Sequence, residues 1–240
     1  MSTFVLIHGA WHGGWCWSRV AKLLRAEGHE VHTPTLAGMG EHAHLTSKQI
    51  TLDTHIEDVV SYIEAYELTG VVLAGHSYGC AIITAATDRL EGTGRIARMV
   101  YLDGSVPHDG DGWFSTSKPE QFAARNKAAQ DAGGIFIPPP PATGFGLSDA
   151  GDIAWVSRRL RPHPYGCYLS TLRLPNLAAG RGIKLLPRTY IDCTAPFYSD
   201  FNGTKQRVKA DPLWKYCEIK TGHDAMVSAP GEVAKLLLQA

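Results

Sequence analysis

The sequence predicts an α/β fold in which a parallel sheet is covered by helices on both faces, and three observations lead to this prediction. Short apolar runs of strand length alternate with longer segments of helical periodicity. Two of these runs, at residues 4–7 and 71–74, carry no charge, which is typical of strands buried on both faces. A length of 240 residues, with 44% hydrophobic and 19% charged residues, suits one globular α/β unit.

The first half of the chain alternates strands and helices without a break. Strands are expected at residues 4–7, 30–33, 71–75 and 96–103, and helices at about 16–26, 51–66 and 78–90. The clearest helix is 51–66, because its apolar residues recur at helical spacing: Leu52, Ile56, Val59, Val60 and Ile63. With two later strands, the sheet is expected to have about six strands, mainly parallel.

The alternation breaks between residues 106 and 182. This segment contains four consecutive prolines from Pro138, several glycines and only weakly amphipathic pieces near 119–132 and 148–160. Strand and helix order then returns with strands at 188–193 and 214–219, and helices at 204–210 and 231–239. We therefore predict a core made of residues 1–105 and 183–240, with residues 106–182 inserted as a lid over the ends of the sheet.

A Gly-x-Ser-x-Gly pattern lies between the apolar strand at 71–75 and the apolar helix that follows. Such a serine sits on a sharp strand-to-helix turn, where its hydroxyl stands clear of the sheet. Gly75 and Gly79 lack side chains and let the two elements pack closely around the turn. Ser77 is therefore the predicted nucleophile.

A serine hydroxyl needs a base to take its proton. On a turn of this kind the order along the chain is serine, acid and then histidine, with the histidine in the loop after the last strand. Of 11 histidines, His223 occupies that loop, between the strand at 214–219 and the closing helix. His223 is the predicted base, whereas His76 is expected to be structural because neighbours on a sharp turn point apart.

The oxyanion of an acyl-transfer reaction needs two backbone N–H donors. Tyr78 N–H, at the start of the helix, supplies one. The loop after the first strand is expected to supply the other, through Ala10 N–H. Aromatic residues of this loop and of the lid are expected to line the substrate pocket: Trp11, Tyr78, Trp113 and Trp155.

Charge and cysteine content exclude several classes of function. Lys+Arg and Asp+Glu balance at 23 each, which argues against nucleic acid or an anionic membrane surface as a partner. The five cysteines include no Cys-x-x-Cys pair, so neither a zinc site nor a disulfide framework is expected. No apolar stretch has transmembrane length, and the expected location is cytoplasmic.

Several motifs together resemble one group of α/β-hydrolases, which includes plant methyl-salicylate and methyl-jasmonate esterases, hydroxynitrile lyases and bacterial pyrethroid-hydrolase-type esterases. The motifs are His8-Gly-Ala-Trp-His-Gly-Gly-Trp15, Leu36-Ala-Gly-Met-Gly40, Leu52-Asp-Thr-His-Ile-Glu-Asp-Val59, Gly75-His-Ser-Tyr-Gly79 and Gly222-His223. The resemblance is specific in the first hundred residues and poor across the lid. It implies a serine carboxylesterase for small, largely apolar or aromatic esters, with no cofactor and often a homodimer.

Two positions separate this chain from the hydroxynitrile lyases of the group. Those lyases carry a threonine where this chain has Gly9, and a lysine directly after the histidine, where this chain has Asp224. A lyase needs positive charge to stabilise the departing cyanide, and a carboxylate would oppose it. Both positions favour ester hydrolysis over the lyase reaction.

The acid of the triad is where the chain departs from its group. Relatives carry an aspartate where this chain has Pro196 in Cys193-Thr-Ala-Pro196. Asp103 is the preferred replacement, because it ends a strand whose end can hold the acid in related hydrolases; Asp192 and Asp200 are alternatives. The acid would orient the histidine and stabilise its charged form. The missing aspartate also leaves open a non-catalytic protein that binds a small molecule on the same fold.

Overall fold

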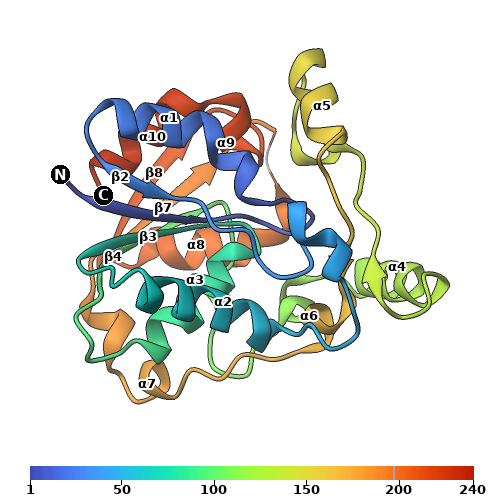
Figure 1. Ribbon diagram of the computed structural model, residues 1–240, viewed down its shortest axis with the longest axis horizontal. Coiled ribbons are helices and arrows are strands. Elements are labelled where there is room, and N and C mark those ends of the chain that lie inside the picture. The colour runs from blue at the N-terminus through green and yellow to red at the C-terminus, as the bar shows by residue number, and fades with distance from the viewer. Residues whose placement is uncertain (197) are drawn as a thin grey trace.

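The computed structural model describes residues 1–196 and 198–240, and its centre is a six-stranded sheet (Figure 1). All neighbouring strands of this sheet are parallel, which confirms the predicted sheet. The strands, in sheet order, are β2 (Glu30–His32), β1 (Thr3–Ile7), β3 (Val71–His76), β4 (Ile96–Leu102), β7 (Arg188–Cys193) and β8 (Trp214–Ile219). Every residue of β3 is buried, as expected of a strand at the centre of such a sheet.

Helices cover both faces of the sheet (Figure 1). On one face lie α1 (Ser18–Ala26), α9 (Ala225–Ser228) and α10 (Pro230–Leu238); on the other lie α2 (Leu52–Ala65) and α3 (Gly79–Arg89). The apolar stripe predicted for α2 is buried as expected, from Leu52 to Ile63. A further helix, α8 (Asn202–Ala210), packs beside β8. None of the helices in the described ranges is both long enough and apolar enough to span a membrane.

Residues 106–182 form short elements outside the main sheet. The helices are α4 (Pro119–Asp131), α5 (Ala150–Ser157), α6 (Tyr165–Leu169) and α7 (Pro175–Ala178), and β5 (Phe136–Ile137) pairs with β6 (His163–Pro164) in an antiparallel ribbon. Figure 1 shows α4, α5 and α6 beyond one end of the sheet, whereas α7 lies near α3. Leu177 N–H of α7 donates to Asp88 Oδ1 of α3 at 2.7 Å. The division into core and lid stays a prediction.

The carboxyl ends of the parallel strands meet at one edge of the sheet. Ala10 lies just beyond β1, Ser77 directly after β3, Asp103 directly after β4 and His223 in the loop after β8. Four segments far apart in sequence are therefore brought to the same edge. The predicted nucleophile, acid, base and one oxyanion donor all come from these loops.

Candidate active site

Ser77 sits on a strained turn between β3 and α3. Its φ is +54°, which is rare for residues other than glycine, and its N–H donates to Leu102 O at 3.0 Å. A Cβ at Gly75 would lie 2.6 Å from Gly79 O, and a Cβ at Gly79 would lie 2.6 Å from His8 O. Gly75 is therefore required where β3 meets α3, as the sequence predicts, whereas Gly79 is required where α3 passes the end of β1.

His223 and Asp103 form a short, buried hydrogen bond. His223 Nδ1–H donates to Asp103 Oδ2 at 2.6 Å, and both side chains are almost wholly inaccessible to solvent. Asp103 has a φ of +43°, and its other oxygen, Oδ1, accepts from Cys193 N–H at 3.3 Å. The bond fixes the imidazole tautomer so that Nε2 is the nitrogen left to accept a proton from a nucleophile.

The two alternative acids have other partners. Asp192 accepts from the Tyr216 hydroxyl at 2.6 Å and forms an ion pair with Lys205 at 2.6 Å. Asp200 accepts from Gln121 Nε2 at 3.2 Å and lies 3.7 Å from Arg125. Among the hydrogen bonds and ion pairs of the described residues, neither carboxylate reaches His223, so the geometry favours Asp103 as the acid.

Ser77 and His223 line the same cavity. No hydrogen bond within residues 1–196 and 198–240 joins the Ser77 hydroxyl to the imidazole; in unliganded hydrolases this bond is often long and tightens when substrate binds. The Tyr198 ring stacks on the imidazole, with 4.1 Å between centroids and 11° between planes. His76 Nε2–H donates to His223 O at 3.0 Å. His223 is thus held by three contacts: the hydrogen bond of Nδ1–H to Asp103, the stacked ring of Tyr198, and the hydrogen bond from His76 to its backbone carbonyl.

The charges around the imidazole are set by burial and by close partners. Burial alone would raise the pKa of Asp103, but the hydrogen bond and charge of His223, with the Lys205 ammonium, outweigh burial and lower it. Asp103 is therefore ionised. Burial, together with the neighbouring His223, lowers the pKa of His76 to about 3. His76 is neutral and serves as a structural donor, as the sequence predicts.

The two expected oxyanion donors border the same cavity. Within the described part of the chain, neither Ala10 N–H nor Tyr78 N–H has a hydrogen-bond acceptor, and both residues line the cavity. Trp11, the next residue of the loop, has a φ of +63°, and His12 Nδ1–H donates to Ala10 O at 2.7 Å. The loop is thus held in a bent conformation that leaves the Ala10 N–H unpaired.

Beneath this loop lies a second buried pair, between His12 and Asp224. His12 Nε2–H donates to Asp224 Oδ2 at 3.1 Å. Burial alone would lower the pKa of His12, but the charge and hydrogen bond of Asp224 outweigh it and raise the pKa. Asp224 therefore carries a neutralising partner and does not line the cavity. The expectation that the Asp224 carboxylate directly opposes an anion in the pocket is therefore wrong. The chain still lacks the lysine that the related lyases carry at this position.

The variant Asp224→Asn is expected to be less stable at neutral pH by about 1–3 kcal/mol, because a buried, charge-assisted hydrogen bond is lost. The raised pKa of His12 contributes stability that is full below its ordinary value near 6.5 and is lost as the pH rises through the raised value. Urea unfolding between pH 6 and pH 9 should show this decline in the unaltered protein and less of it in the variant.

Asp131→Asn is the matched control, because Asp131 makes an exposed ion pair with Lys127. It should leave both the stability and its pH dependence almost unchanged. An equal decline with pH in Asp224→Asn and in the unaltered protein would contradict the assignment of a charged His12.

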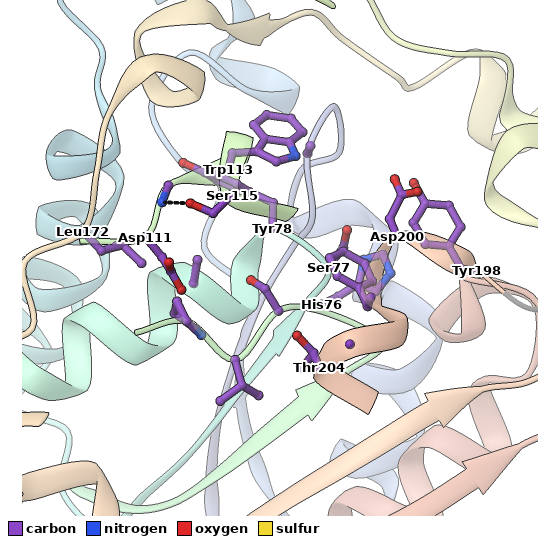
Figure 2. A pocket seen from close by; sticks show the side chains of 18 of the residues that line it. His76, Ser77, Tyr78, Asp111, Trp113, Ser115, Leu172, Tyr198, Asp200 and Thr204 are labelled. Atoms are coloured by element: carbon purple, nitrogen blue, oxygen red, sulfur yellow. Dashed lines mark hydrogen bonds between the residues drawn. The ribbon is translucent and has the colours of Figure 1, made fainter. Parts of the chain in front are cut away.

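The cavity at the strand ends has a volume of about 260 Å³ and is lined by both apolar and polar side chains. In Figure 2, Tyr198 and Asp200 lie on one side of Ser77, and Asp111, Ser115 and Trp113 lie on the other. Trp11, Tyr78 and Trp113 line it, as expected. The expectation for Trp155 is wrong: its ring packs against Trp15 and lies beneath the guanidinium groups of Arg19 and Arg159, away from this cavity.

Sequence reasoning missed four residues of the site. Tyr198 covers the imidazole, Lys205 contacts Asp103, His12 holds the Ala10 loop, and Arg125 lines the cavity beside Asp200. Of these four residues, only Lys205 could have been identified from the sequence pattern. It stands three residues before Val208 in α8, which places a lysine on the buried face of that helix.

One cluster of potential metal ligands occurs in the described residues, formed by His55, His163 and Cys167. His55 Nδ1 accepts from the Tyr78 hydroxyl at 2.9 Å, and His55 Nε2–H donates to Ala37 O at 2.8 Å. Cys167 Sγ lies 3.6 Å from His55 Nδ1 and 3.9 Å from His55 Nε2. Because both ring nitrogens of His55 already have hydrogen-bond partners, this imidazole has no free lone pair for a metal ion. This arrangement does not fit a metal centre.

Comparisons with known proteins agree with this geometry. A family model described as the alpha/beta hydrolase family matches residues 4–236. The carbendazim hydrolyzing esterase of Nocardioides sp. (strain SG-4G) is 40% identical, covering 99% of this chain and 98% of the relative. Methylesterase 10 of Arabidopsis thaliana is 26% identical, covering 98% and 90%. An extracellular alpha/beta-hydrolase from a Paenibacillus species is 25% identical, with a TM-score of 0.85 and coverage of 100% and 99%. The resemblance inferred from the sequence motifs is confirmed.

Proposed function

The chain belongs to the alpha/beta hydrolase family, and we propose that it is a carboxylic ester hydrolase that cleaves small, largely apolar or aromatic esters through a serine acyl-enzyme. The observation that supports this most directly is the 2.6 Å hydrogen bond between His223 and Asp103, at the edge of the cavity that also holds Ser77. Full-length relatives named as esterases support the same reaction.

In the proposed mechanism, His223 Nε2 takes the proton of Ser77 as Oγ attacks the ester carbonyl. Asp103 holds the imidazole in the required tautomer and stabilises its charged form. The N–H groups of Ala10 and Tyr78 bind the oxyanion. His223 then protonates the leaving alcohol, and water, deprotonated by the same imidazole, releases the acid from Ser77.

The size of the cavity supports a small substrate. About 260 Å³ lies just below the 300–1,000 Å³ that is usual for ligand pockets. The rings of Trp11, Tyr78 and Trp113 provide flat apolar walls, which suit an aromatic or short aliphatic group. The carbendazim hydrolyzing esterase and the methylesterases among the relatives make carbendazim and methyl esters of aromatic acids the first substrates to test.

Gly9 supports hydrolysis over the lyase reaction. A Cβ at Gly9 would lie 2.8 Å from His76 Nδ1 and 3.1 Å from Ser77 Cβ. The threonine of the related lyases therefore does not fit beside Ser77 unless His76 moves. Because His76 also holds the backbone of His223, this region has little freedom to adapt.

The proposed function predicts that the purified protein hydrolyses p-nitrophenyl acetate and that a fluorophosphonate labels it at one residue, Ser77. The measurements are p-nitrophenol release and the mass of the labelled peptide. Rapid labelling together with cyanide release from mandelonitrile would support the lyase instead. Binding of small esters without turnover or labelling would support a non-catalytic binding protein.

We also infer a cytoplasmic location, as the sequence implies, and the resemblance implies that homodimers are frequent in this group. All five cysteines are free, and four of them are buried, which suits a reducing compartment. Light scattering on the purified protein measures the oligomeric state.

A further inference from the structure

A buried lysine links the catalytic acid to the second aspartate. Lys205 Nζ lies 2.6 Å from Asp103 Oδ1 and 2.6 Å from Asp192 Oδ1, and the lysine side chain is only 3% exposed. Tyr216 donates to the far oxygen of Asp192 at 2.6 Å. A continuous polar chain therefore runs from Tyr216 through Asp192, Lys205 and Asp103 to His223.

The two oxygens of Asp103 have different partners. Oδ1 forms the ion pair with Lys205 and accepts a hydrogen bond from Cys193 N–H, and Oδ2 accepts the hydrogen bond from the His223 imidazole. An ammonium on one side of a carboxylate restricts its rotation, so that the second oxygen keeps its direction. This restraint matters here because Asp103 stands at a strand end with a positive φ, where its backbone gives the side chain an unusual direction.

Lys205 also balances the charge of the cluster. Two carboxylates on adjacent strands, both almost wholly buried, would repel each other and favour a proton on one of them. A protonated Asp103 could not stabilise the imidazolium that forms during catalysis. One ammonium between the two carboxylates offsets this repulsion. The hydrogen bond and charge of His223 lower the pKa of Asp103 more than Lys205 does, so Asp103 is expected to stay ionised when the lysine is replaced.

We propose that Lys205 is a positioning residue of the catalytic site, which holds Asp103 in place through its bridge to Asp192 and sets the pH range in which His223 acts as a base. This inference rests on the proposed serine esterase. Asp192 then has a defined role: it anchors the lysine from the neighbouring strand and is not itself the acid.

Other titratable groups surround the imidazole and must be kept constant in any test. His76 of β3 is 4.6 Å away between ring centroids, and Tyr198 stacks on the ring. Asp224, the next residue, is paired with His12, and Asp200 lines the same cavity beside Arg125.

The test is the pH profile of kcat/KM for p-nitrophenyl acetate in Lys205→Met. Because a positive charge near the imidazole is removed, the acidic limb of the profile should move to higher pH by about one unit. Lys205→Arg keeps the positive charge, so the acidic limb should stay at the pH found for the unaltered protein. Lys127→Met is the matched control: Lys127 of α4 forms an exposed ion pair with Asp131, so its removal should not move the limb.

Asp192→Asn provides an independent variant with the opposite sign. It removes a negative charge from the far side of Lys205, so the acidic limb should move to lower pH. This variant also serves if Lys205→Met does not fold. The acidic limb of the pH profile could instead stay unchanged in Asp192→Asn and in any folded Lys205→Met, even if their melting temperatures are lower. That result would show that the lysine is only structural and would overturn the proposal.

A second measurement needs no substrate. The titration of the His223 imidazole, followed by NMR, should move in the same directions as the acidic limb in both variants. A protein that hydrolyses no ester but shows these shifts would refute the proposed function and still support the coupling of Lys205 to His223. Ester hydrolysis with no shift in either measurement would refute only the role of Lys205.

Discussion

Replacing Ser77 by alanine is expected to lower kcat for ester hydrolysis by about 10⁶-fold. The nucleophile is lost, and the base and acid then have no proton to move in the acylation step. The residual rate would come from the oxyanion donors and from substrate binding. Measurements of p-nitrophenol release, with enough enzyme to detect slow turnover, should show the loss in kcat.

Ser105→Ala is the control, because Ser105 lines the same cavity as Ser77 but does not stand on the strand-to-helix turn. It should keep kcat within a few-fold of the unaltered protein and should still be labelled by a fluorophosphonate. If Ser77→Ala hydrolyses the ester at a rate similar to that of the unaltered protein, the acyl-enzyme mechanism is excluded.

Replacing Asp103 by asparagine is expected to lower kcat by about 10⁴-fold, with a small change in KM. The amide lacks the charge that stabilises the imidazolium, and its NH₂ group can favour the wrong imidazole tautomer. The loss concerns the transition state, so it should appear in kcat. Circular dichroism and thermal unfolding should accompany the kinetics, because Asp103 also pairs with Lys205.

Asp200→Asn is the matched comparison, since Asp200 lines the cavity near Tyr198 but its partners are Arg125 and Gln121. We expect it to change KM more than kcat. A folded Asp103→Asn that retains most of its activity, with a large loss of kcat in Asp200→Asn or Asp192→Asn, would reassign the acid.

Much of the fold follows from local patterns, and the structure agrees with them. The helix at 51–66 was predictable because burial on one face leaves a helical periodicity in the sequence. The strand at 71–75 was predictable because burial on both faces leaves an uninterrupted apolar run. The turn at Ser77 was predictable because close packing of strand and helix demands glycine at positions 75 and 79. These signals depend on neighbours within a few residues.

The acid was harder to predict, because its identity depends on contacts between distant strands. Asp103 and Asp192 both lie at or near strand ends, and only the positions of His223 and Lys205 separate their roles. Tyr198 acts by stacking on His223, and His12 acts through a hydrogen bond to the carbonyl of Ala10. Contacts of these kinds produce no recognisable residue spacing in the sequence. Trp155 was misplaced for the same reason, since the course of residues 106–182 has no strong periodicity.

The loops after the strands supply the reacting groups, whereas Trp113, Arg125, Phe145 and Leu172 of the 106–182 segment supply much of the cavity wall. Selectivity and reactivity are thus encoded in separate parts of the polypeptide. Exchanging that segment for the equivalent piece of a related esterase offers a direct route to new substrate preferences, with the bond-breaking apparatus left as it is.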